Sequence, residues 1–210
     1  MKTYEILPTD KNLVQTLIDD TIGRDSDVFR FVNILNSIDC SYSVALDGRW
    51  GSGKTFFVKQ AKLVLDANNE HLAVMDADVR KKVLTSCQKF IPANSELQPQ
   101  VCVYYDAWEN DNDGDPILSL VYSILQQVDE KTPFPKDNKI FEKVAALADC
   151  ITGKSTTAVL ESMKSDSVLD DLRKSKSIHS TIVEFLDHLL EERADRLVVI
   201  IDELDRCKPN

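Results

Sequence analysis

The chain has 210 residues, of which 43% are hydrophobic, and its 25 basic and 35 acidic residues give a formal net charge of −10. This length and apolar content suffice to bury one substantial core, with room for an inserted or flanking subdomain, and give no sign of overall disorder. The negative charge opposes non-specific binding to nucleic acid or to an anionic membrane surface. Nucleic acid could still bind through a local basic patch, but the sequence shows no such patch and gives no evidence for a nucleic-acid partner.

The cysteines are odd in number and widely spaced, and they include no C-x-x-C pair. This pattern argues against a disulfide framework or a zinc site and fits a reducing compartment. The N-terminus lacks the apolar core of a signal peptide, and the longest strongly apolar run, Leu197 to Ile201, is too short to cross a bilayer. We therefore expect a cytoplasmic protein with no membrane segment in this chain.

The first predicted elements are a helix, a strand and a second helix. Apolar side chains recur at helical spacing over 25–38, and Asp25 or Ser26 could cap the start of that helix. Residues 42–46 form a short β-favouring run that leads into a glycine-rich turn and then into a helix near Thr55. The order predicted here is strand, tight loop, helix.

The second half of the chain repeats this order. A strand is predicted over 101–105, and Asp115 and Pro116 are suited to cap and begin the helix that follows it. An amphipathic helix over 178–190 leads into the apolar run 197–201, which is typical of a strand buried on both faces. Strands that alternate with helices in this way predict an α/β fold with a parallel sheet.

A more polar stretch over 131–176 interrupts this alternation and carries a modest helical signal near 141–147. We expect a helical insertion there. The predicted organisation is therefore a first core part over 1–130, the insertion, and a second core part over 177–210. The insertion contains Gly153-Lys154-Ser155, which copies the end of a phosphate-binding motif without its first glycine, and we do not expect it to bind phosphate.

Residues Gly48 to Thr55 read Gly-Arg-Trp-Gly-Ser-Gly-Lys-Thr and satisfy the P-loop (Walker A) pattern G-x-x-x-x-G-K-[ST]. A triphosphate needs several backbone N–H groups directed into one concavity, and side chains obstruct the required backbone conformations. Three of the six glycines of the chain fall within this segment, whereas a plain glycine turn, the alternative, would not require such clustering.

Each position of this loop has an expected role. Lys54 would neutralise phosphate oxygens, and the Thr55 hydroxyl would bind Mg²⁺. The candidate nucleotide-binding residues are Gly48, Arg49, Trp50, Gly51, Ser52, Gly53, Lys54, Thr55 and Phe56.

Asp202 and Glu203 follow the apolar run 197–201, as in a Walker B strand. An acid at the end of a parallel strand reaches the sheet edge at which a P-loop opens, so Asp202 is the second candidate Mg²⁺ ligand. An adjacent second acid can orient or deprotonate an attacking water, so Glu203, with Lys54, is a candidate catalytic residue. The alternative is an ordinary acidic strand end.

Aromatic and acidic clusters elsewhere have simpler interpretations. Trp50, Trp108 and Phe56 are expected to pack in the core more than to stack on a ligand. The acidic run 109–115 lacks the spacing of a calcium-binding EF-hand and is expected to be a solvated loop.

Four blocks of the sequence resemble the KAP family of P-loop NTPases. They are Asp19-Asp20-x-x-Gly23-Arg24, the P-loop at 48–55, Asp106-Ala107-Trp108, and Asp202-Glu203-Leu204-Asp205-Arg206-Cys207. The resemblance implies a P-loop NTPase three-layer sandwich with a mostly parallel sheet, an ATP preference, Mg²⁺ as cofactor, and the roles given above for Asp202 and Glu203. Members that span membranes carry paired helices between the two nucleotide motifs, and the polar stretch 131–176 resembles the soluble members.

The resemblance also extends to other residues and to the limits of the chain. It implies that Arg24 lies near the base or the phosphates. Asp106 stands where the family often has Asn, which leaves no amide at that position to orient Glu203, and Asn110 is the candidate substitute. The chain ends at Asn210, eight positions after Asp202 and before the next strand of this class. We therefore expect an incomplete sheet, in a fragment or in a chain that another segment completes.

The residues indicate three functions, and the resemblance to the KAP family implies the biological settings of the first. The leading one is an ATP-binding and ATP-hydrolysing molecular switch, in signalling or phage defence, that works with a protein partner or by self-assembly. The second is a nucleotide-binding regulatory or scaffold module without turnover. A small-molecule kinase is disfavoured because a kinase does not need Glu203.

Overall fold

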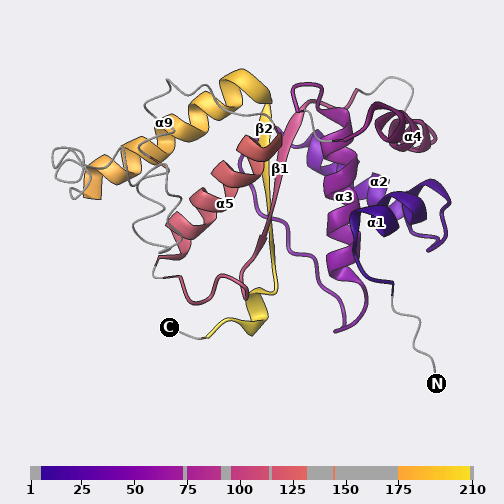
Figure 1. The fold of residues 1–210 in the computed structure, drawn as a ribbon, viewed down its shortest axis with the longest axis horizontal. Coiled ribbons are helices and arrows are strands. Elements are labelled where there is room, and N and C mark those ends of the chain that lie inside the picture. Colours follow the sequence, from indigo (N-terminus) through magenta and orange to yellow (C-terminus); the bar gives the residue numbers. More distant parts are fainter. Residues whose placement is uncertain are drawn as a thin grey trace. The chain divides into compact units, whose positions relative to one another are not determined.

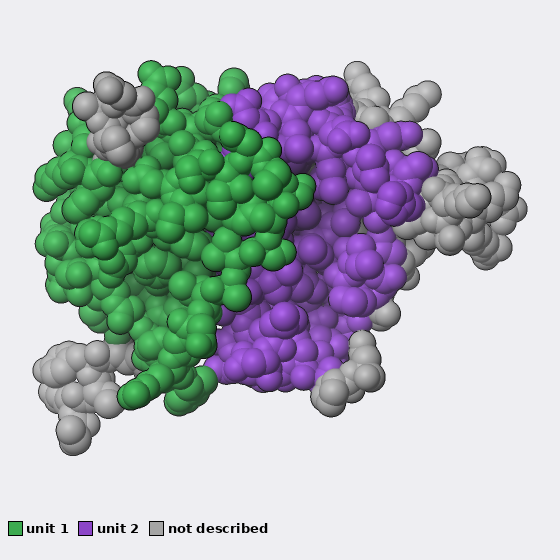
Figure 2. Space-filling view, turned by 180° about the vertical axis from the view of Figure 1, so that it is seen from behind, with its two compact units in different colours: residues 1–102 green, residues 103–210 purple. Residues whose placement is uncertain are grey.

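The computed structural model describes residues 6–72, 75–90, 96–113, 115–131, 144 and 175–208. The chain divides into two compact units, residues 1–102 and residues 103–210, which Figure 2 distinguishes by colour. The expected insertion over 131–176, with its helical signal and the sequence Gly153-Lys154-Ser155, lies almost entirely outside the described residues.

Unit 1 contains the helices α1 (Asp10–Ile18), α2 (Asp25–Ser37), α3 (Lys54–Asn68) and α4 (Ala77–Gln88). Figure 1 shows α3 beside the other three, and each of them contacts it. The helix α3 thus lies at the centre of a small apolar core. Fully buried side chains of this core are those of Leu17, Val28, Phe29, Val64, Leu65 and Val83.

The structure confirms the predicted helices around the glycine-rich loop and adds two that the periodicity did not indicate. The helices α2 and α3 match the predictions for 25–38 and for the segment after the loop. The unexpected helices α1 and α4 begin at side-chain caps: the Thr9 hydroxyl accepts from the Asn12 N–H, and the Asp76 carboxylate accepts from the Asp78 N–H. Such caps satisfy backbone donors that a helix start leaves unpaired.

The predicted strand over 42–46 is wrong. These residues form no strand, and their apolar side chains are exposed, with Val44 48% exposed. A strand exists only where a neighbour accepts and donates its backbone hydrogen bonds. Within the described residues the sheet consists of β1 (Gln100–Asp106) and β2 (Arg196–Asp202), and neither pairs with 42–46.

The strands β1 and β2 are parallel neighbours and match the predicted runs 101–105 and 197–201. Beside them, unit 2 contains α5 (Pro116–Lys131), α9 (Ser175–Arg193) and the short 3₁₀ helix η1 (Leu204–Arg206). These elements confirm the alternation of strands and helices. Among the described residues, no helix combines the length and the apolar character that a bilayer span requires.

Helix α5 begins as predicted. The Asp115 carboxylate accepts hydrogen bonds from the N–H groups of Ile117 and Leu118, at 2.9 and 3.1 Å. Pro116, at the first helical position, lacks an N–H and has a backbone angle suited to a helix, so it leaves no donor unpaired. This start needs only adjacent residues, which explains why the sequence revealed it.

One side chain of helix α5 bonds both backbone groups of a residue of β1. The Gln127 amide donates to the Tyr104 carbonyl at 2.7 Å, and the Tyr104 N–H donates to the Gln127 carbonyl oxygen at 3.1 Å. A residue of a neighbouring strand would satisfy the same two backbone groups. Gln127 thus substitutes for a strand neighbour at this position.

The expectation that β2 is buried on both faces is wrong, because its residues are only partly buried and Ile201 is exposed. Two of the three aromatic residues expected in the core are also at the surface: Trp50 is 83% exposed and Trp108 is 55% exposed, whereas Phe56 is partly buried. A strand or ring is buried only when other layers cover it. Periodicity and residue type do not reveal that cover.

Candidate functional site

The P-loop turns through two glycines whose backbone is left-handed. Gly51 has a φ of +74° and Gly53 a φ of +84°, and Lys54 is the first residue of α3. Side chains disfavour this conformation, so glycine is required at both places. The predicted tight loop before a helix is confirmed, and the first N–H groups of α3 lie at its end.

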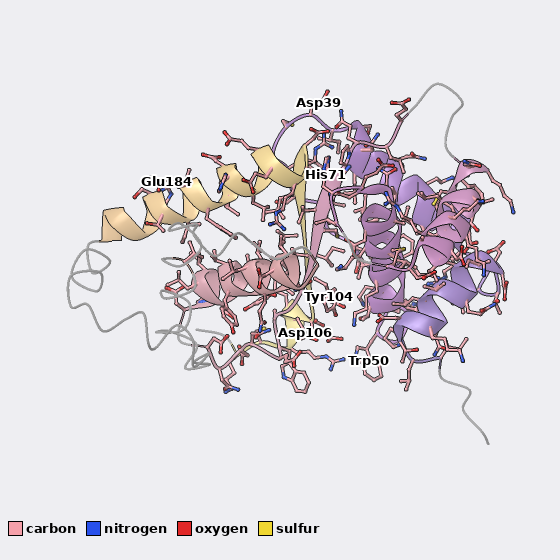
Figure 3. All side chains as sticks on the ribbon, turned by 45° about the horizontal axis from the view of Figure 1, so that its top comes forward. Asp39, Trp50, His71, Tyr104, Asp106 and Glu184 are labelled. Carbon is pink, nitrogen blue, oxygen red and sulfur yellow. The ribbon has the colours of Figure 1, made fainter. Side chains whose placement is uncertain are left out.

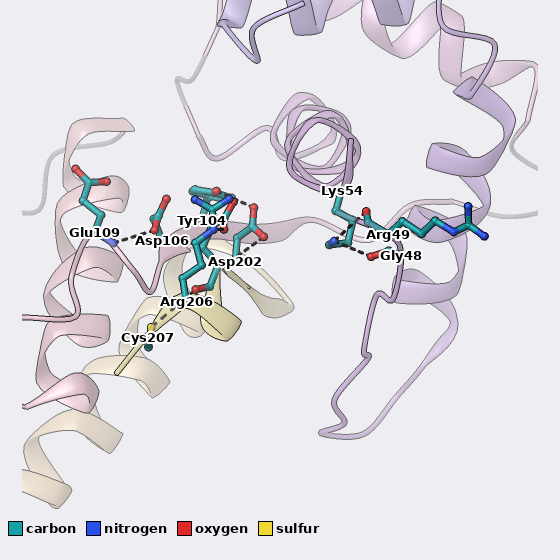
Figure 4. Close-up of polar contacts among 10 residues, drawn as sticks. Gly48, Arg49, Lys54, Tyr104, Asp106, Glu109, Asp202, Arg206 and Cys207 are labelled. Atoms are coloured by element: carbon teal, nitrogen blue, oxygen red, sulfur yellow. Dashed lines mark hydrogen bonds and ion pairs between the residues drawn. The ribbon is translucent and has the colours of Figure 1, made fainter. Parts of the chain in front are cut away.

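At Gly48 the absence of a side chain avoids a close contact with Ser52. A Cβ on Gly48 would lie 2.9 Å from the Ser52 Oγ and 3.6 Å from the Lys54 Cδ. The side chain of Lys54 bends back over the loop, where its ammonium group donates to the carbonyls of Gly48 at 2.9 Å and Arg49 at 3.5 Å (Figure 4). These two carbonyls therefore hold the charge of Lys54 beside the glycines of the loop.

This arrangement suits an anion with several oxygens. It combines the start of α3, the Lys54 ammonium group and the partly buried Thr55 hydroxyl, which together supply donors and positive potential. Arg49 and Trp50 are exposed on the turn, and Trp50 is labelled in Figure 3. The residues present fit a phosphate chain, and the role of Thr55 as an oxygen ligand for a metal ion stays a prediction.

A side chain from outside the loop contacts its backbone. The Arg24 Nη1 atom donates to the Ser52 carbonyl at 2.9 Å. The resemblance implied a place for Arg24 near base or phosphates, and the structure puts it against the loop itself. Because the two residues are 28 positions apart in sequence, no spacing signal could have revealed this contact.

The acidic end of β2 lies in unit 2. The Tyr104 phenol donates to the Asp202 Oδ2 atom at 2.9 Å, and the Glu203 N–H donates to Oδ1 at 3.0 Å (Figure 4). Burial raises the pKa of Tyr104, and its hydrogen bond to Asp202 raises the pKa further. The phenol therefore stays protonated and serves as a donor to the carboxylate. The sequence did not reveal the role of Tyr104, because nothing in it distinguishes Tyr104 from other aromatic residues in strands.

Glu203 is held in an uncommon conformation. Its φ is +56°, and its carboxylate forms an ion pair with the Arg206 guanidinium of η1. The same guanidinium lies 5.6 Å from the centre of the Trp108 ring, a favourable cation–π distance. The backbone of Glu203 is strained, and the ion pair restrains its side chain. The sequence could have suggested this ion pair, because Glu203 and Arg206 are three positions apart.

Polar groups at the end of β1 bond to residues of the turn that follows it. Figure 3 shows Tyr104 and Asp106 on this strand. The Asp106 carboxylate accepts from the Glu109 N–H at 3.0 Å, and the Asn110 amide donates to the Asp106 carbonyl at 2.8 Å. Asn110 thus contacts the end of β1, and its use as an amide that orients Glu203 stays a prediction.

The candidate residues form two groups. The residues from Gly48 to Phe56 are in unit 1, and Asp202 and Glu203 are adjacent in unit 2. Within the described residues, no group of three or more His, Cys, Asp and Glu side chains is arranged to hold a metal ion. The binding, catalytic and metal roles of these residues therefore remain predictions.

Comparison with known proteins identifies the family. Searches of curated proteins and of solved structures gave no match. The KAP family P-loop domain matches residues 28–210, from the first turn of α2 to the last residue, and leaves the block at 19–24 outside. The α/β fold with its parallel strands is that of a P-loop NTPase with an incomplete sheet. With most of its length matched, the chain belongs to the KAP family of P-loop domains.

Proposed function

We propose that this KAP-family chain is a Mg²⁺-dependent switch that binds and hydrolyses ATP. The observation that carries the proposal is the P-loop, in which left-handed Gly51 and Gly53 precede α3 and the Lys54 ammonium group lies over the loop backbone. Membership of the family supports nucleotide binding and the possibility of hydrolysis. The choice of ATP, of Mg²⁺ and of a switch is our proposal.

In this proposal some residues bind the phosphates and Mg²⁺, and Glu203 takes part in the hydrolysis. The N–H groups at the start of α3 and the Lys54 ammonium group bind phosphate oxygens, for which Lys54 must leave the Gly48 carbonyl. The Thr55 hydroxyl and the Asp202 carboxylate bind Mg²⁺, which neutralises developing phosphate charge when bound. Glu203 orients the attacking water, and its ion pair with Arg206 sets the direction of the carboxylate.

The switch would act through other parts or partners. Binding of ATP stabilises one arrangement of the chain, hydrolysis resets it, and a protein partner or a second copy carries the output. We propose a cytoplasmic role in signalling or phage defence. The net charge of the chain, −10, fits such a role better than binding to nucleic acid.

A nucleotide-binding regulatory or scaffold module without turnover is the second candidate. The observation that favours it is the Arg206 ion pair, which occupies the Glu203 carboxylate. If that pair persisted with nucleotide bound, Glu203 would not reach a water molecule. The chain would then change state on binding alone.

Two measurements on the full chain test the proposal. Titration of a fluorescent ATP analogue, with and without Mg²⁺ and in competition with GTP, should show Mg²⁺-dependent binding that Lys54→Ala abolishes. Multiple-turnover phosphate release should be lost in Glu203→Gln while binding remains. Unchanged affinity in Lys54→Ala would refute the nucleotide site, and binding without phosphate release would establish the second candidate.

A further inference from the structure

We propose that Arg24 is a positioning residue for phosphate binding, which directs the Gly53 N–H into the P-loop by holding the Ser52 carbonyl. This inference rests on the proposed nucleotide binding. It assigns a role to a residue that lies before the loop in sequence, outside the segment that the family matches.

The contact is close and specific to one peptide group. The Arg24 Nη1 atom is 2.9 Å from the Ser52 carbonyl oxygen, and a Cβ built on Gly53 would lie 3.6 Å from the same nitrogen. The guanidinium therefore lies against the Ser52–Gly53 peptide from the side of its carbonyl.

A fixed direction of the Ser52 carbonyl also fixes the direction of the Gly53 N–H. In a planar trans peptide the C=O and the following N–H point in opposite directions. A carbonyl of Ser52 that is directed at Arg24 therefore directs the Gly53 N–H away from Arg24. This N–H belongs to the last loop residue before α3, where P-loop backbone donors are directed at phosphate.

The Ser52–Gly53 peptide needs such a restraint because the backbone rotates easily at a glycine. Gly53 has no Cβ and a φ of +84°, and glycine passes between left- and right-handed backbone at little cost. The preceding peptide is held differently, since the Ser52 N–H donates to the Arg49 carbonyl at 3.1 Å. Arg24 supplies the corresponding restraint on the next peptide from outside the loop.

Arg24 is itself held by the start of α2. Its carbonyl accepts from the N–H groups of Asp27 and Val28, at 3.0 and 3.1 Å. The helix α2 packs on α3, and the rings of Phe31 and Phe57 lie 5.5 Å apart between them. The beginnings of the two helices are thereby held together, with Arg24 on one and the Ser52–Gly53 peptide before the other.

A simple effect of charge is the competing explanation, and Arg30 provides the control. Arg30 also lies on α2, its side chain is 79% exposed, and its ion pair with Asp27 is long, at 3.9 Å. Arg24→Ala and Arg30→Ala each remove one positive charge from a chain of net charge −10. Only Arg24→Ala removes the contact with Ser52.

Calorimetric titration of the full chain with Mg²⁺–ATP and with Mg²⁺–tripolyphosphate tests the inference. Arg24→Ala should weaken both ligands about tenfold, because a Gly53 N–H that is no longer directed into the loop loses roughly one hydrogen bond to phosphate. Arg24→Lys should recover part of the loss because it keeps a charged donor, and Arg30→Ala should bind like the unaltered chain. The melting temperature without ligand should be the same in all four proteins, because Arg24 is exposed.

A second readout follows the peptide directly. With only six glycines in the chain, selective ¹⁵N-glycine labelling resolves the Gly53 amide in a heteronuclear NMR spectrum. Arg24→Ala should shift this signal without ligand, and Arg30→Ala should not.

The possible failures are distinguishable. If Arg24→Ala bound both ligands normally while Lys54→Ala bound neither, the nucleotide site would stand and the positioning role would fall. An equal loss in Arg30→Ala would reduce the effect to charge, and a loss for ATP but not for tripolyphosphate would assign Arg24 to the base or ribose. If the unaltered chain bound neither ligand, the proposed function would fail and the phosphate role of Arg24 with it, whatever the Gly53 signal showed.

Discussion

The Tyr104 phenol donates a hydrogen bond to the Asp202 carboxylate at 2.9 Å and thereby joins the two parallel strands at the acidic end of β2. Burial keeps the phenol protonated, because it raises the pKa of Tyr104. A charged acceptor makes such a hydrogen bond stronger than one between neutral groups. The hydrogen bond thus orients Asp202, which we propose as a Mg²⁺ ligand.

Tyr104→Phe removes this donor and leaves the ring. We expect the free energy of unfolding to fall by about 1–2 kcal/mol and the Mg²⁺ concentration needed for half-maximal nucleotide binding to rise, because Asp202 loses its orientation. Urea unfolding and a Mg²⁺ titration measure the two effects. Tyr105→Phe is the matched control, since its phenol bonds the Ser119 hydroxyl at 3.1 Å: it should lower stability and leave the Mg²⁺ requirement unchanged. The same Mg²⁺ requirement in both variants would contradict the role given to Tyr104.

Arg206→Ala breaks the ion pair with Glu203 and the contact with the Trp108 ring. We expect phosphate release at saturating ATP to fall about tenfold, with nucleotide affinity unchanged, because a water-orienting carboxylate that loses its direction slows the chemical step without affecting binding. Lys208→Ala, which removes a nearby exposed cation that contacts Asn112, should leave phosphate release unchanged. Faster release in Arg206→Ala would mean that the ion pair restrains Glu203 from acting.

Gly53→Ala and Gly48→Ala separate backbone strain from lack of space. Gly53 has a φ of +84°, so alanine is strained there whatever room exists, and we expect a loss of about 1–2 kcal/mol in stability together with weaker ATP binding. At Gly48 the nearest obstacle is the Ser52 Oγ, the end of a side chain that can rotate. Gly48→Ala should therefore cost less, and adding Ser52→Ala should restore part of its loss. Urea unfolding measures the stabilities, and a smaller loss in Gly53→Ala than in Gly48→Ala would be the opposite of what the backbone angles require.

Asp25 should make stability depend on pH. Burial raises the pKa of this carboxyl from 3.8 to about 6, and the nearby Asp20 carboxyl adds to the rise while Lys89 opposes it. Because the folded chain then binds the proton more tightly than the unfolded chain, this contribution to stability is present at low pH and is lost as the pH rises through 6. The loss between pH 5 and pH 7.5 should be about 1 kcal/mol.

The variant Asp25→Asn isolates this contribution. Its free energy of unfolding, relative to that of the unaltered chain, should increase by about 1 kcal/mol between pH 5 and pH 7.5. Asp27→Asn removes an exposed carboxyl from the same helical turn and should show a smaller change. A constant difference between Asp25→Asn and the unaltered chain across this range would show that Asp25 titrates normally.

The sequence alone determined those features of this protein that depend on residues close together in the chain. The spacing from Gly48 to Thr55 predicted a tight loop before a helix, since two left-handed glycines and a helix start are local features. Asp115 and Pro116 predicted the beginning of α5 for the same reason. The apolar runs of β1 and β2 were long enough to be recognised as strands without knowledge of their partners.

The tertiary structure decided what depends on distant parts of the chain. The run 42–46 has the residue types of a strand but no partner within the described residues, and Trp50 and Trp108 have the size of core residues but no cover. The contacts Arg24–Ser52 and Tyr104–Asp202 join residues 28 and 98 positions apart. Hydrogen bonds and burial of this kind arise when helices and strands pack, and no local pattern contains that information. The contacts of Arg24 and Tyr104 with residues of the candidate site were therefore found only in the folded chain.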